Sequence, residues 1–143
     1  MKHFSDKELC CKCCGRLPPE AKENLKALVD NVLDPVRELY GFPIRVYSAF
    51  RCPAHNAAVG GVAKSQHIVG EAADITACSP AENLKVARLI AQLGHYDQMI
   101  LYVNTGSMEP RFIHVSWKRC GNNRHRILKH VMGTSGYSTV TNV

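Results

Sequence analysis

The stretch from Ser65 to Ile75 constrains the fold of this chain more than any other segment. It carries His67 and Asp74, seven positions apart, with Gly70 and small residues between them. Side chains meet on one face of a helix only when they are three or four positions apart, so this pair cannot share a helix. A loop at His67, a turn at Gly70 and a strand at Asp74 would bring the two side chains together. We therefore predict a change from loop to strand within this stretch.

Imidazole nitrogen and carboxylate oxygen are both zinc ligands, and a catalytic zinc takes three protein ligands and leaves a fourth position open. His114 is the best candidate for the third ligand, because it lies inside the apolar segment 112–117. A histidine within an apolar strand needs a partner for its ring nitrogens, and a metal ion is one such partner. A backbone carbonyl is the other, and for an isolated histidine it is the more frequent one.

The remaining pattern predicts helices and short strands around this stretch. A helix opens at Pro19 and ends at Gly41, with a kink or break at Pro35. A second helix begins after the capping residue Ser79 and stops at Gly94. Alternation and β-branching predict four short strands, at residues 42–47, 74–76, 98–103 and 112–117.

This order of elements predicts an α+β fold with a small, mainly antiparallel sheet flanked by helices. The basic segment 119–130 is expected to be helical from about Asn123. We expect one domain over residues 1–132 and a flexible tail over residues 133–143, which are mostly Gly, Ser, Thr and Val without a period. A domain of this size buries roughly two-thirds of its unfolded surface.

The net charge is +6 and the pI is near 9.0, which favours an acidic partner but also fits a plain surplus of surface Lys and Arg. The basic run 118–129 is more typical of a solvated face than of a nucleic-acid site, so no nucleic acid is expected. No segment approaches the ~18 apolar residues of a membrane span, and the N-terminus lacks the apolar core of a secretory signal. We expect a monomer that is cytoplasmic as synthesised and does not bind membranes.

Four of the seven cysteines crowd into positions 10–14. They contain two overlapping C-x2-C spacings, which would suit half of a structural zinc site. No second C-x2-C or H-x3-H pair follows, and the default for a chain without a secretory signal is reduced thiols. The role of the cluster stays open at this point.

Three segments form a recognisable set: Ser48-Ala49-Phe50-Arg51, Ser65-x-His67-x-x-Gly70-x-Ala72-x-Asp74, and Ile113-His114-Val115. Together they resemble the zinc D-alanyl-D-alanine carboxypeptidase family, which shares its fold with the hedgehog signalling domain. The resemblance runs from about Phe4 to Leu128. Within the family, the chain looks most similar to the small single-domain members of phages and gut bacteria. Its S-x-H-x-x-G-x-A-x-D pattern is far more specific than two isolated metal ligands.

The resemblance implies a zinc ion held by three residues, namely His67, Asp74 and His114. Arg51 matches the arginine that grips the substrate, a role that suits its planar fork. A structural salt bridge at a strand end is the alternative for this arginine. Ser48 and Ser65 match motif serines that either bond to the substrate or cap a turn.

The catalytic base has no clear counterpart in this chain. Many relatives carry an acid or a second histidine three positions before the third ligand, where this chain has Arg111, which stays protonated. Glu109 is the nearest carboxylate and is the candidate base. The weaker candidates are Tyr102, Asp97 and His95, and Glu71 suits a supporting position beside the ligands.

The resemblance therefore implies a zinc metallopeptidase, a hydrolase that cleaves D-Ala-containing stem peptides of bacterial peptidoglycan as a carboxypeptidase or an endopeptidase. The alternative is a catalytically weak or inactive zinc-binding module that binds cell-wall peptides. A chain without a secretory signal would reach the wall after release from the cell, as a phage lysin does.

Overall fold

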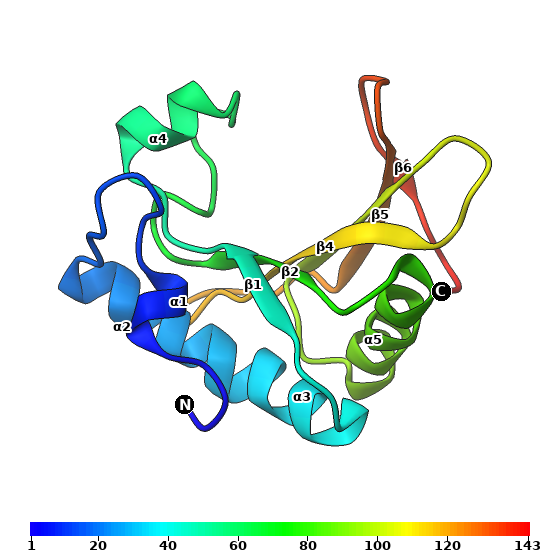
Figure 1. The fold of residues 1–143 in the computed structure, drawn as a ribbon, viewed down its shortest axis with the longest axis horizontal. Coiled ribbons are helices and arrows are strands. Elements are labelled where there is room, and N and C mark those ends of the chain that lie inside the picture. Colours follow the sequence, from blue (N-terminus) through cyan, green and yellow to red (C-terminus); the bar gives the residue numbers. More distant parts are fainter.

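A six-stranded sheet forms the centre of the computed structural model, which describes residues 1–143 (Figure 1). The strand order is β1-β2-β4-β3-β5-β6, and every neighbouring pair is antiparallel except β3 and β5, which are parallel. The predicted α+β class and mainly antiparallel sheet are thus confirmed. The strands are β1 (Arg45–Ser48), β2 (Ala72–Thr76), β3 (Gln98–Val103), β4 (Pro110–Ser116), β5 (Arg126–Val131) and β6 (Ser138–Thr139).

The helices α1, α2, α3 and α5 lie on one side of the sheet, and α4 lies on the other (Figure 1). No helix is both long and apolar enough to cross a membrane. The α-helices are α1 (Asp6–Leu9), α2 (Pro19–Leu28), α3 (Asp34–Tyr40), α4 (Pro53–Ala58) and α5 (Pro80–Leu93).

The long helix predicted from Pro19 to Gly41 is interrupted where the sequence indicated. A π-helical segment, η1 (Val29–Leu33), separates α2 from α3, and the backbone N–H of Asp34 donates to the carbonyl of Val29. Pro35 has no N–H to continue the regular ladder, so the wider turn falls just before it. Gly41 ends α3 in the left-handed conformation with a φ of 82°.

The two faces of the sheet differ in composition. Side chains alternate between these faces along β2 and β4, and this alternation positions the site. Ala73 and Ile75 of β2 and Ile113 of β4 belong to a core of 25 buried residues shared with the helices. The intervening residues Asp74 and His114 therefore face the opposite side. Each fully buried Ile or Leu on the core face contributes about 2 kcal/mol, which holds these strands in register.

The C-terminal part of the chain corrects one prediction and qualifies another. The expected helix from about Asn123 is wrong, because residues 126–131 form β5 in parallel register with β3. Ile127 and Val131 of β5 pack against the core, so tertiary pairing outweighs the helical preference of the basic residues. Residues 133–143 were expected as a loose tail, but β6 pairs with β5 and the Val140 N–H donates to the Ile127 carbonyl at 2.9 Å.

Candidate metal centre and pocket

The three predicted zinc ligands lie together on the face of the sheet opposite the core. Asp74 and His114 are direct partners in the β2–β4 ladder, and His67 reaches them from the loop before β2. Nδ1 of His114 lies 3.0 Å and Nε2 of His67 lies 3.3 Å from Oδ1 of Asp74. The ligand atoms of all three residues lie within 4.8 Å of one another. The sequence thus predicted a set of neighbours that are separated by up to 47 positions in the chain.

The imidazole of His67 is held by backbone contacts that leave one nitrogen available. Its Nδ1 lies 2.7 Å from the carbonyl oxygen of Ala49, and its side chain is only 3% exposed. Its backbone N–H donates to Oγ of Ser65, and its carbonyl accepts from the N–H of Arg51. A carbonyl on Nδ1 fixes the tautomer that presents Nε2 as an acceptor, as is usual for metal-binding histidines. In this structure Ser65 therefore caps the turn that carries His67.

Gly70 provides the turn between His67 and Asp74 for two physical reasons. Its φ is +77°, and a Cβ at this position would overlap the backbone of Ala21 in α2. The adjacent Val69 carbonyl accepts a hydrogen bond from the Asn24 side chain at 2.8 Å. The loop is thus pressed against α2, which explains why a residue without a side chain is needed here.

The carboxylate of Asp74 is shared between the histidines and Arg51. Its Oδ1 faces both imidazoles, while Oδ2 accepts a hydrogen bond from the guanidinium of Arg51 at 3.1 Å. Burial alone would raise the pKa of Asp74, but the hydrogen bond with His114 and the nearby imidazole of His67 outweigh it and hold the pKa below its usual range. Asp74 is therefore ionised at neutral pH, as a metal ligand must be.

Arg51 is anchored on all three of its nitrogens. Nε donates to Oγ of Ser48 at 3.1 Å, and one terminal nitrogen donates to Oδ1 of Asn56 at 3.3 Å. The other terminal nitrogen binds Asp74. The structural ion pair considered for Arg51 is thus present, with Ser48 as its support. A guanidinium has five N–H groups, so two remain for a ligand in the pocket.

The donor set fits a zinc ion. It offers two imidazole nitrogens and one carboxylate oxygen, the three-ligand chemistry of a catalytic zinc site. The remaining nitrogen of His67 and the remaining oxygen of Asp74 are occupied by protein partners, which orients both ligands. All three residues line a pocket of about 770 Å³, so a fourth position would face open space.

The pocket is lined mainly by polar and cationic side chains, with an aromatic wall. Tyr102, Phe112 and Tyr137 form that wall, and the rings of Tyr102 and Phe112 stack with centroids 4.4 Å apart. Tyr137 lies in the segment expected as a tail, and its sequence surroundings gave no sign of this position. The lysines and arginines of the lining are Arg51, Lys64, Lys118, Arg124 and Arg126.

The candidate base Glu109 does not line this pocket. It is exposed in the turn between β3 and β4, where its N–H donates to Oγ of Ser107. Asp97 is fully buried and is bound by Arg124, and His95 is also absent from the lining. Glu71 does line the pocket, and apart from Asp74 it is the only carboxylate there.

Two comparisons with known proteins bear on this site. No curated protein is similar enough in sequence to count as a relative. The model of the Peptidase M15 family matches residues 2–116, which include every residue of the three-ligand set. M15 peptidases depend on zinc, in agreement with the donors found here. The match covers most of the chain, and the chain therefore belongs to the Peptidase M15 family.

Proposed function

We propose that this chain is a zinc-dependent peptidase that hydrolyses D-Ala-containing stem peptides of bacterial peptidoglycan. One observation carries the proposal: in a chain of the Peptidase M15 family, His67, Asp74 and His114 converge on the floor of an open, cationic pocket. The family and the sheet also support a hedgehog/DD-peptidase type of fold. Action on the wall would follow release of the protein from the cell.

The residues around the ligands divide the work of peptide hydrolysis. Zinc supplies a Lewis acid that activates water near neutral pH and polarises a carbonyl oxygen. Arg51 uses its two free N–H groups to hold a carboxylate or carbonyl of the peptide, next to the carboxylate of Asp74 that it orients. Ser48 acts through Arg51, and Ser65 acts through His67, so both are positioning residues.

Proton transfer is assigned to Glu71 rather than to Glu109. Glu71 lines the pocket and has no ion-pair partner, while its side chain accepts only a 3.5 Å hydrogen bond from Gln66. A carboxylate in this state can accept a proton from water and return it to the leaving amine. Burial and the neighbouring Tyr137 raise the pKa of Tyr102, so its phenol stays protonated and serves as a hydrogen-bond donor.

The pocket lining supports an anionic peptide as the substrate. Lys64 and Arg126 are exposed at the pocket and have no carboxylate partner. Stem peptides offer carboxylates to such cations and small methyl side chains to the aromatic wall. A binding module that has kept the zinc without the chemistry is the alternative, because the position three before His114 holds Arg111.

The test is incubation of the pure protein with purified peptidoglycan and with short peptides ending in D-Ala-D-Ala, followed by mass spectrometry. We expect products that disappear with EDTA and return with zinc. His67→Ala should abolish turnover, while His95→Ala, outside the pocket, should retain it. Intact substrates with zinc-loaded protein would favour the binding module. Glu71→Gln should abolish turnover and retain zinc, whereas Glu109→Gln should change neither turnover nor zinc content. The opposite pattern would make Glu109 the general base.

A further inference from the structure

A second group of metal-binding side chains lies away from the pocket floor. The Sγ atoms of four cysteines all lie within 4.8 Å of one another. This four-cysteine cluster consists of Cys11, Cys13, Cys14 and Cys52. None of the four lines the pocket that contains His67, so the cluster is separate from the site already described.

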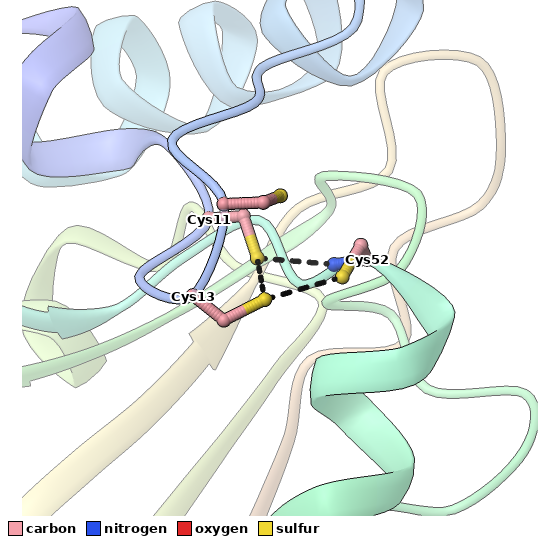
Figure 2. A group of neighbouring side chains, drawn as sticks. Cys11, Cys13 and Cys52 are labelled. Carbon is pink, nitrogen blue, oxygen red and sulfur yellow. Dashed lines mark hydrogen bonds between the residues drawn. The ribbon is translucent and has the colours of Figure 1, made fainter.

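The cluster joins two segments that are distant in the sequence. Three of its members lie in the loop that follows α1, and Cys52 comes directly before α4. Figure 2 shows the sulfur atoms of Cys11, Cys13 and Cys52 turned toward one another. The sulfur of Cys13 lies 3.5 Å from that of Cys11 and 3.5 Å from that of Cys52. The remaining cysteine of the N-terminal run, Cys10, points elsewhere and donates to the Lys7 carbonyl.

These distances suit a tetrahedral metal site. With a zinc–sulfur distance of about 2.3 Å, the sulfurs of a tetrahedron lie about 3.8 Å apart. All seven cysteines are free thiols in this structure, and four thiolates this close would repel one another without a cation between them. A set of four soft sulfur ligands selects zinc or iron. Zinc is the simpler occupant, because it has no redox chemistry and needs no electron-transfer partner.

Backbone N–H groups support the sulfurs in the way that a metal-thiolate site requires. The N–H of Cys52 donates to Sγ of Cys11 at 3.4 Å, and the N–H of His55 donates to Sγ of Cys52 at 3.4 Å. Such outer contacts stabilise negative charge on sulfur and orient the ligands. We propose that the four-cysteine cluster binds a structural zinc ion, in addition to the zinc proposed for the peptidase site.

The position of the cluster indicates what this zinc would stabilise. The Leu9 carbonyl accepts from the N–H of Phe50, and Cys52 follows Arg51, so the N-terminal loop lies against the segment that carries Arg51. The carbonyl of Ala49 in the same segment holds the ring of His67. A metal that links Cys52 to the loop would therefore clamp the support of both Arg51 and His67, while staying outside the pocket.

The test uses the full chain, purified with a reducing agent. Metal analysis should find about two zinc ions per chain in the wild type and about one in His67→Ala, whose peptidase site is broken. Cobalt(II) added to zinc-stripped His67→Ala protein should produce thiolate-to-metal charge-transfer absorption, which histidine and carboxylate ligands do not give. Cys52→Ser should weaken that absorption, because one of the four thiolates is lost, and Cys78→Ser, at an exposed cysteine outside the cluster, should leave it unchanged.

Several results would overturn the proposal. They are zinc that is lost entirely in His67→Ala, a reduced cluster that gives no thiolate–cobalt absorption, and iron in place of zinc. If Cys52→Ser does not fold, His67→Ala itself supplies the answer, since a mercurial that titrates its thiols should release the remaining zinc in step. Failure of the peptidase assay would leave these thiolate signals untouched, so the two proposals fail separately.

Discussion

A terminal nitrogen of Arg51, Nη2, donates a hydrogen bond to Oδ2 of Asp74 at 3.1 Å. The opposite oxygen of the same carboxylate faces both imidazoles. A residue singled out by its motif as a substrate grip is thus also the group that orients a metal ligand. The two roles are compatible, because Arg51 keeps two N–H groups free after its three protein contacts.

The first prediction concerns this ion pair. Arg51→Lys keeps the charge but cannot reproduce the three-way anchoring, so zinc affinity at the peptidase site should fall by about 10- to 100-fold. The measurement is zinc competition with a chromogenic chelator in protein whose four-cysteine cluster is left intact, so that a difference between variants reports on the peptidase site. Arg45→Lys on the exposed side of β1 is the control and should bind zinc normally. Equal zinc affinities in Arg51→Lys and Arg45→Lys would mean that Arg51 does not orient the metal ligand and serves only to contact the substrate.

The second prediction separates two reasons for glycine at position 70. Gly41 and Gly70 both have positive φ, but a Cβ at Gly41 meets open space while a Cβ at Gly70 overlaps Ala21. Gly41→Ala should cost about 1 kcal/mol from the backbone conformation alone. Gly70→Ala should cost more than about 2 kcal/mol, because the loop must also move off α2. Urea denaturation measures both, and similar losses would mean that the contact with α2 yields without cost.

The third prediction is a pH dependence from Asp97, which is fully buried and comes directly before β3. Burial alone would raise the pKa of Asp97, but hydrogen bonds from Arg124, Gln66 and Ser116 outweigh it and lower the pKa well below its usual range. A carboxyl with a lowered pKa in the folded state stabilises the fold fully above its unfolded pKa of about 3.9. That contribution is lost as the pH falls from there toward the folded pKa.

Asp97→Asn should therefore destabilise the protein by about 2 kcal/mol at pH 7, a moderate value because Arg124 remains partly exposed. The difference from wild type should shrink as the pH falls below about 4. Urea denaturation in the presence of chelator measures this without a contribution from metal loss. Asp6→Asn, which breaks only an exposed ion pair with Lys22, should change stability by less than about 0.5 kcal/mol. A difference that persists at acid pH would exclude the charge as the cause.

The sequence predicted best what depends on local rules or on a specific motif. Gly41, Pro35 and Ser79 mark helix ends and a break where the structure has them, because caps and proline act within a turn. His114 could be matched to Asp74 because the motif names both, and the β2–β4 register places them opposite each other. The meeting of His67, Asp74 and His114 could therefore be predicted from the sequence motif.

What the sequence could not predict depends on which distant segments meet. Residues 126–131 carry basic residues that are compatible with a helix, and only the free edge of β3 makes them a strand. Cys52 has no cysteine at C-x2-C spacing, so its place beside Cys11 and Cys13 required the fold. Tyr137 lies in a segment without periodicity, and reaches the pocket only because β6 pairs with β5.

The last prediction concerns the charge of the substrate. Arg126 is exposed, lines the pocket and has no carboxylate partner, so it is free to attract an anionic group. Arg126→Glu should lower kcat/KM for a peptide with a free side-chain carboxylate by about fivefold, mainly through KM, since an exposed charge acts on binding rather than on the bond that breaks. Turnover of the same peptide with glutamine in place of glutamate should change little.

Salt provides the control for that experiment. The loss caused by Arg126→Glu should shrink at 1 M salt, where screening acts over about 3 Å. Lys7→Glu on α1 carries the same charge change outside the pocket lining and should leave both peptides unaffected. If Arg126→Glu slowed both peptides equally at every salt concentration, the residue would be supporting β5 and the pocket wall rather than reading charge. The inference that the substrate is anionic would then depend on Lys64 and Arg51 alone.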